Sequence, residues 1–508
     1  MDLDCLFINA ASNKVAKQNL SAKYSAIETP TWALLLAESC RSKGYKVGII
    51  DAEAERLSDI DLKKKVNILN PKIILFVVYG DNPNAGTISM IGASRTAKSL
   101  KNENQNICFV GSHISALPRD VLEEDYVDIV FTNEGVYALH NLLKLVKGNL
   151  ANWREKLETI KGIGFKRDGK PILNEPEMIV PQEKLDEDLP GYAWDLLPFE
   201  KQPLDLYRAH YWHANFDDNQ RTPFAAIYTS LGCPFGCGFC MINILNRTDL
   251  SDDVSSADSR IMRVWSLKWV EKVLRQLASY GVKTLKFSDE LFFFDEKRYI
   301  PILECLERID HKFNIWCYAR VDSVRTKYLP KFKSAGINWL CLGIESGNRV
   351  IRKEVSKGSF KDVKVEKVVE EIQRNNMYVL GNYIFGLPED NIETMNDTLN
   401  MALEMPTEHA NFYACVALPG SPIYIEAKKN HKHLPKHNEY EKFAFLSYEH
   451  IPLSTKYCSS SEVLSFRDKA WEKYFSNPAY LDFLEQRLGN IAKENVIKMS
   501  KVKLKRKI

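Results

Sequence analysis

Short apolar runs alternate with helix-period segments in two separate series along the chain, and this alternation most constrains the fold. Strands and helices that alternate in this way predict a parallel, doubly wound α/β sheet. In the first series the predicted strands are residues 5–8, 47–50, 73–78, 107–110 and 127–131. We therefore predict a Rossmann-like first domain over residues 1–147.

The second series predicts a partial barrel. Its strands are residues 225–229, 284–288, 314–318, 339–344, 378–385 and 411–416. Six β/α repeats are too few for an eight-fold TIM barrel, so residues 208–425 predict an open, TIM-like (β/α)6 barrel. Residues 148–207 carry six prolines and weak periodicity, which predicts a linker. Residues 426–508 predict a helical C-terminal accessory region.

Composition argues against several classes of protein. The formal charge of +3 is spread over both signs, so nucleic acid is not an expected partner. The acidic N-terminus differs from a signal peptide, and the sequence has no apolar run long enough for a membrane span, so we expect a cytoplasmic protein. Residues 498–507 form a basic run that we interpret as a solvated tail.

Three cysteines follow the first strand of the second series. Cys233, Cys237 and Cys240 are separated by three and then two residues, and glycines at 236 and 238 let the loop curl around a cluster corner. Three ligands would leave the fourth iron of a [4Fe–4S] cluster open. The alternative is a structural zinc site with His210 or His213 as fourth ligand, although zinc ligands usually come as two close pairs. The other eight cysteines are scattered and predict small core residues.

The triad, with aromatic Phe239 before its last cysteine and a strand before the loop, resembles the signature of the radical S-adenosylmethionine (SAM) superfamily. The resemblance extends over the six repeats. In that family the open iron binds the amino and carboxylate groups of SAM, and one electron cleaves SAM to methionine and a 5'-deoxyadenosyl radical. The resemblance also implies a small-molecule substrate and an electron donor such as flavodoxin or ferredoxin.

Polar residues near the ends of later strands match positions that hold SAM in the family. The second strand ends at Asp289 and Glu290, where the family contacts the SAM ammonium, although the usual glycines are absent. The resemblance assigns ribose or carboxylate contacts to Arg320, Glu345 and Ser346. The remaining implied SAM contacts are the backbone of Phe239, beside adenine, and Asn382 on the fifth strand. The alternative for Asp289 or Glu345 is a structural ion pair with Arg320.

A doubly wound domain before such a barrel resembles the cobalamin-binding class of the superfamily. The residues that match the loops around the corrin ring are Asn82, Pro83, Gly111, Ser112, His113, Glu134 and Gly135. The first domain lacks the Asp-x-His-x-x-Gly motif that supplies a lower cobalt ligand in other cobalamin proteins. We expect His113 to pack beside the corrin rather than to bind cobalt.

These features lead to competing functional hypotheses. The first is a cobalamin-dependent radical SAM methyltransferase that methylates an unactivated carbon of a small molecule or biosynthetic intermediate. The second keeps both cofactors but performs a radical rearrangement, cyclisation or oxidation. The third is a non-catalytic, zinc-binding regulator. Methylthiotransferases are disfavoured because Cys5, Cys40 and Cys108 lie too far apart to match the further cysteine trio of that group.

Overall fold

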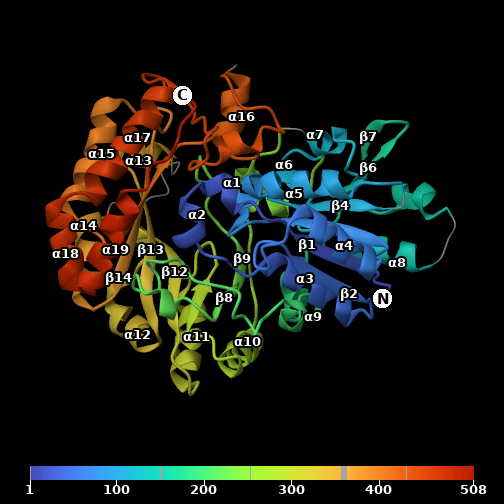
Figure 1. Cartoon of the computed structure of the whole chain (residues 1–508), viewed down its shortest axis with the longest axis horizontal. Helices are drawn as coiled ribbons and strands as arrows, with labels where there is room; N and C mark the ends of the chain where they lie inside the picture. Colours follow the sequence, from blue (N-terminus) through green and yellow to red (C-terminus); the bar gives the residue numbers. More distant parts are fainter. Residues whose placement is uncertain (1, 104, 149–151, 252, 356–362, 431) are drawn as a thin grey trace.

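The computed structural model describes the chain except for residues 1, 104, 149–151, 252, 356–362 and 431. Two α/β units lie side by side along the longest axis (Figure 1). The first unit, in blue and cyan, lies at one end, and the C-terminal helices, in orange and red, lie at the other. The barrel strands lie between them. No helix of the described part of the chain is long and apolar enough to cross a membrane.

The first unit is built on a seven-stranded sheet with the order β2-β1-β3-β4-β5-β6-β7. Its first five strands are parallel, as predicted: β1 (Cys5–Asn9), β2 (Val47–Asp51), β3 (Ile73–Val78), β4 (Ile107–Gly111) and β5 (Ile129–Phe131). The helices beside them include α3 (Thr31–Ser42), α4 (Asp59–Leu69), α5 (Gly86–Leu100), α6 (Ser112–Ala116) and α8 (Val136–Lys147). All residues of β3 and β4 are buried, as expected for strands that helices cover on both faces.

Two strands of this sheet come from the predicted linker. The hairpin of β6 (Ile163–Arg167) and β7 (Lys170–Leu173) extends the sheet in antiparallel orientation. Its turn is Asp168-Gly169, and both residues have positive φ (49° and 75°), as a tight hairpin requires. The predicted domain boundary at residue 147 is therefore too early for the sheet, which is mixed rather than wholly parallel. Pro171 obscured the strand signal and is tolerated because β7 is an edge strand.

The second unit is a six-stranded parallel sheet with the order β15-β14-β13-β12-β11-β8. β8 and β15 are its two edges and do not pair, so the prediction of an open partial barrel is confirmed. The strands are β8 (Phe224–Ile227), β11 (Thr284–Phe287), β12 (Asn314–Arg320), β13 (Ile337–Glu345), β14 (Tyr378–Phe385) and β15 (His409–Ala414). The intervening helices include α10 (Leu267–Ser279), α11 (Glu296–Arg308), α14 (Val365–Arg374) and α15 (Ile392–Glu404). A ribbon of β9 (Ser230–Gly232) and β10 (Met262–Val264) flanks the cysteine loop.

The helices α17 (Ser460–Phe475), α18 (Pro478–Leu488) and α19 (Asn490–Ser500) follow the barrel, and α17 packs against its β15 edge. The chain after α19 turns back, and the Arg506 guanidinium donates to both oxygens of Asp468 (2.9 Å each) and to the carbonyls of Phe445 and Ser447. Only 10% of the Arg506 side chain is exposed. The prediction of a solvated tail is therefore wrong for Arg506.

Buried ion pairs join the two units. Arg263 of β10 pairs with Glu134, which follows β5, at 2.7 Å, and each side chain is only 2% exposed. Lys286 of β11 pairs with Glu28 at 2.7 Å, with exposed fractions of 0% and 5%. Because removal of one partner leaves the other charge buried and unpaired, such pairs hold the two units in a defined relative position.

Candidate active site

A cavity of about 600 Å³ lies between the first unit and the inner face of the barrel. Its walls include the cysteine loop, the inward-facing strand residues, C-terminal residues such as Phe445 and Arg467, and a wall from the first unit. This last wall is made by α1 (Asn13–Lys17), α2 (Leu20–Lys23) and the loop after β3. The size is typical of a small-molecule site.

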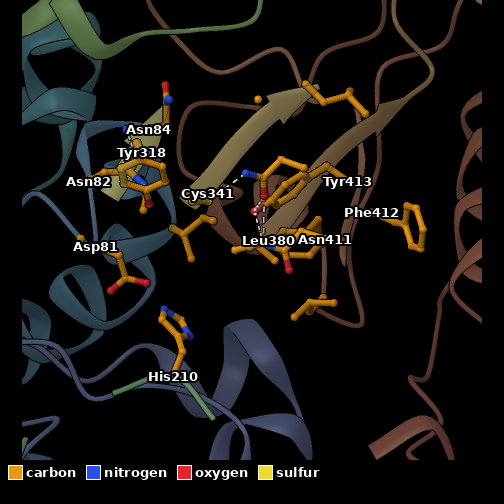
Figure 2. Close-up of a pocket in the computed structure, with 18 of the residues that line it drawn as sticks. Asp81, Asn82, Asn84, His210, Tyr318, Cys341, Leu380, Asn411, Phe412 and Tyr413 are labelled. Carbon is orange, nitrogen blue, oxygen red and sulfur yellow. Dashed lines mark hydrogen bonds between the residues drawn. The ribbon is translucent and has the colours of Figure 1, made fainter. Parts of the chain in front are cut away.

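Strand register brings the barrel residues together. In parallel strands, alternate residues point to the same face, so residues paired in register form layers inside the barrel. One layer holds Tyr318, Cys341, Leu380 and His409, and the next holds Arg320, Gly343, Asn382 and Asn411. All of these residues line the cavity. Figure 2 shows Tyr318, Cys341, Leu380 and Asn411 around this space.

The cysteine triad lies in the loop after β9, and all three cysteines line the cavity. The Asn243 side chain fixes the start of this loop because it accepts from the Cys233 amide (3.0 Å) and donates to the Cys233 carbonyl (2.8 Å). Two neighbours approach the sulfur atoms: Arg320 Nη1 is 3.7 Å from Cys237 Sγ, and Asn84 Nδ2 is 3.5 Å from Cys240 Sγ. Burial raises the pKa of the Cys233 thiol to about 12.

The geometry of the triad does not match a preformed zinc site. Tetrahedral zinc with Zn–S bonds of about 2.3 Å needs sulfur atoms about 3.8 Å apart. Among the described residues the three cysteine sulfurs do not form a group within 4.8 Å of one another. The proposed fourth ligands are also engaged elsewhere, since His213 hydrogen-bonds to the Asn314 carbonyl (3.0 Å) and His210 faces Glu28 (3.3 Å). The zinc alternative therefore has no support in the geometry.

Two partly buried carboxylates face the cavity near the triad. Burial raises the pKa of Glu290 to about 8, and its Oε2 atom has no hydrogen-bond partner. Burial also raises the pKa of Glu345 to about 7, although Arg320 opposes this shift. Glu345 lies at an irregularity of β13 and has a positive φ of 65°. Such strained, desolvated carboxylates are typical of ligand sites and suit the ammonium and hydroxyl donors of SAM.

Other predicted SAM contacts divide between the cavity and the protein interior. Phe239, Arg320 and Asn382 line the cavity. Asp289 does not, because its carboxylate accepts from the amide and hydroxyl of Thr229 (3.0 and 2.7 Å) and pairs with Arg298 (2.6 Å) rather than with Arg320. It holds the strand that leads into the cysteine loop.

Arg320 and Ser346 show how different the surroundings of these positions are. Arg320 forms two hydrogen bonds to Asp322 (2.9 and 3.0 Å) and lies 4.0 Å from the ring centre of Phe235. Ser346 is fully buried outside the cavity wall, and its hydroxyl contacts Thr398 (3.2 Å) and accepts from the Asn348 amide. Ser346 thereby stabilises the turn after β13.

Of the predicted cobalamin contacts, Asn82 lines the cavity, and its Nδ2 donates to the Tyr318 hydroxyl at 3.2 Å. Pro83 begins the turn that follows, and its side chain lies outside the described part of the structure. Gly111 is required by close packing, since a Cβ there would lie 1.9 Å from the Val78 carbonyl oxygen. Gly135 has a positive φ of 84° where α8 begins. Neither glycine lines the cavity.

Ser112, His113 and Glu134 are also buried away from the cavity wall. Ser112 is fully buried beside Gly86. His113 contacts Thr87 through Nδ1 (3.1 Å), and burial lowers its pKa to about 3. Glu134 forms the buried pair with Arg263. Glu134 thus joins the two units, whereas Ser112 and His113 pack against α5 inside the first unit.

Several residues of the cavity wall lie outside the predicted set of SAM and cobalamin contacts. Asn84 bridges the two units, because its Oδ1 accepts from the Met241 amide (2.9 Å) while its Nδ2 approaches Cys240. Lys286 is fully buried in β11, where a charge inside an apolar strand was the signal to follow. Asp81 and His210 lie beside one another at the cavity (Figure 2), and their ligand atoms lie with a Glu28 oxygen in a group within 4.8 Å. Arg467 enters the wall from α17.

Residues 227–402 match the family model described as the radical SAM superfamily. This segment of the chain is therefore a radical SAM domain, as predicted.

Two curated relatives and one solved structure are similar to this chain over most of its length. The uncharacterized methyltransferase PH0819 of Pyrococcus horikoshii is 26% identical over 459 residues, which are 89% of each chain. The anaerobic magnesium-protoporphyrin IX monomethyl ester cyclase of Rubrivivax gelatinosus is 24% identical over 89% of this chain and 75% of its own length. The structure of TsrM, a radical SAM methyltransferase from Kitasatospora setae with cobalamin and a [4Fe–4S] cluster bound, superimposes with a TM-score of 0.68. At 13% identity over 99% of both chains, this last match shows a common fold.

Proposed function

We propose that the protein is a cobalamin-dependent radical SAM methyltransferase that transfers a methyl group to an unactivated carbon of a small molecule. One observation carries the proposal: a single cavity is bounded both by the cysteine triad and by the first unit. The relative named as a methyltransferase and the cobalamin-bound TsrM structure, which share this architecture, support the assignment.

The residues of the chain have distinct tasks in this proposal. The triad holds a cluster, and Glu290 and Glu345 bind the ammonium and hydroxyl groups of SAM. Arg320 places a positive charge beside Cys237. When bound, the cluster would supply the electron for reductive cleavage of SAM, and cobalamin would carry the methyl group.

Cobalamin would lie against the wall of the first unit, where Asn82 and the loop after β3 face the cavity. The buried wall excludes water, which protects a reactive carbon radical from side reactions. A one-electron donor such as flavodoxin or ferredoxin would serve the cluster. These roles agree with the unpartnered Oε2 atom of Glu290, which a cationic or donor ligand would satisfy.

A second candidate is a radical cyclisation or oxidation that uses the same cavity without methyl transfer. The Rubrivivax gelatinosus relative, named as a cyclase, favours it. The two candidates differ in the fate of the SAM methyl group, because only the first moves it to another molecule.

The test is anaerobic reconstitution of the protein with iron, sulfide and hydroxocobalamin, followed by desalting and incubation with methyl-deuterated SAM and a reductant. We expect one cluster and one cobalamin per chain, and mass spectrometry should find deuterated methyl on the recovered cobalamin. The matched control is Cys341→Ala, a cavity cysteine outside the triad, which should retain the cluster. Loss of cobalamin on desalting, or cobalamin without label, would contradict methyl transfer.

A further inference from the structure

The part of the cavity wall beside β15 holds a buried arginine. Arg467 of α17 is 3% exposed and lines the cavity together with Trp471, one turn later on the same face. Its Nε donates to the Phe412 carbonyl (2.7 Å) and its Nη1 to Asp468 (2.8 Å). Its Nη2 atom donates to none of the described residues and is not fully buried. A donor of the guanidinium thus remains available to the cavity.

The counter-charge of Arg467 is shared. Arg506 binds both oxygens of Asp468 at 2.9 Å, so two guanidinium groups share one carboxylate. Arg506 does not line the cavity. A buried cation with half a counter-charge is unfavourable unless a ligand completes the pairing.

Other charged groups of the cavity wall are accounted for. Near the first unit, Lys286 pairs with Glu28, and Lys17 lies 3.9 Å from Asp81. Near the triad, Arg320 forms two hydrogen bonds to Asp322. Glu290 and Glu345 face the proposed SAM position. Among the described residues of the wall, the positive charge left for a substrate is therefore that of Arg467.

Neighbours of Arg467 complete a polar pocket. The Arg467 guanidinium carbon lies 5.7 Å from the ring centre of Phe445, and the Tyr413 ring packs edge-on against the same ring at 4.9 Å. The Tyr413 hydroxyl accepts from Asn411 Nδ2 at 3.1 Å and donates to Asn382 Oδ1 over a long contact of 3.5 Å. A charged oxyanion is a stronger acceptor than this amide oxygen and would take over the proton. Figure 2 shows Asn411 and Tyr413 side by side at this wall.

We propose that Arg467, with Tyr413 oriented by Asn411, forms a subsite for an oxyanion substituent of the substrate, a carboxylate or a phosphate. The inference rests on the proposed function only in taking the cavity as the substrate site. A guanidinium and a hydroxyl donate charge-assisted hydrogen bonds to such a group, and Phe445 and Trp471 offer flanking aromatic surface. The oxyanion would anchor the substrate at the β15 wall while another part of it faces the triad.

The test uses isothermal titration calorimetry to compare probes that share a naphthalene group and differ in their head groups. The probes are 1-naphthoate, 1-naphthyl phosphate, 1-naphthalenemethanol and 1-naphthylmethylammonium. The protein carries its cluster, hydroxocobalamin and S-adenosylhomocysteine, so the cofactor positions are filled and no turnover occurs. We expect at least about tenfold tighter binding of one of the two anions than of the alcohol, and weakest binding of the ammonium. The anion that binds more tightly shows whether the subsite prefers a carboxylate or a phosphate.

Variants separate a binding role from a structural one. Arg467→Gln should reduce anion affinity at least about tenfold and leave the alcohol probe unchanged, whereas Arg467→Lys should retain most of the anion preference. Arg506→Gln separates the two guanidinium groups, because it leaves Asp468 to Arg467 alone without removing a group from the cavity wall. It should weaken anion binding less than Arg467→Gln does.

Equal binding of anion and alcohol by the unmodified protein would overturn the proposal, as would tightest binding of the ammonium. An Arg467→Gln protein that keeps its anion preference would overturn it as well. Failure of the proposed function looks different, since it appears as loss of cluster or cobalamin before any probe is added.

Discussion

The buried pair of Glu134 and Arg263 gives a sharp test of how the two units are held together. Glu134→Gln removes the negative charge but keeps an oxygen that accepts from the Val180 amide and from Arg263. We therefore expect a loss near the lower end of the range for a broken buried pair, about 3 kcal/mol. Arg263→Met also removes the hydrogen bonds to the Val180 carbonyl (2.6 Å) and to Asn246 (3.2 Å), so its loss should be about 5 kcal/mol.

A double-mutant cycle isolates the interaction. Once Arg263 is gone, the unpaired Glu134 charge is itself unfavourable, so neutralising it costs little more. The double variant should lose about 5 kcal/mol rather than the sum of about 8, a coupling of about 3 kcal/mol. Equilibrium urea unfolding followed by circular dichroism, on protein without cofactors, measures these values. Additive losses would refute the reasoning, as would unchanged stability combined with impaired cobalamin retention, which a direct cobalamin contact by Glu134 predicts.

Three further predictions follow from the site. Alanine at Cys233, Cys237 or Cys240 should abolish the cluster, measured as bound iron and sulfide, whereas Cys341→Ala should retain it. Asp289→Asn leaves Arg298 without its buried partner, so it should lower the free energy of unfolding by about 3–5 kcal/mol and reduce iron incorporation. Burial lowers the pKa of His113 to about 3 from 6.5, so the unfolded chain takes up the proton first as the pH falls. The free energy of unfolding should therefore fall below about pH 6.5, and His113 should account for about 2 kcal/mol of the loss at about pH 5. His113→Asn should remove this contribution, which urea unfolding at about pH 6.5 and about pH 5 measures.

The fold was largely predictable because its signals are local. Apolar runs with intervening helical segments located the five parallel strands of the first unit and the six of the barrel. The cysteine spacing located the triad for the same reason, since all three ligands lie in one loop. The β6–β7 hairpin was missed because strands of five and four residues with an internal proline give a weak periodic signal.

Side-chain direction was less predictable. Asp289 and Glu290 are neighbours after one strand, yet Glu290 faces the cavity while Asp289 points to Arg298 and Thr229. A shift of one residue along an extended segment moves a side chain to the opposite face. Beyond the end of the strand, the sequence does not determine which face each side chain takes. The role of Glu134 depends on Arg263, which lies 129 positions away, and that of Arg467 depends on a helix outside the barrel. Such long-range partners leave no local pattern.

The central claim is that the triad and the first unit share one cavity for two redox cofactors. Electron paramagnetic resonance of the reconstituted protein, reduced so that the cluster and the cobalt of bound cobalamin each carry an unpaired electron, tests it most directly. We predict that the two signals are broadened by mutual magnetic interaction, and that alanine at all three triad cysteines leaves a sharp cobalt signal alone. Two unperturbed signals in the same protein, or no bound cobalamin, would contradict the account.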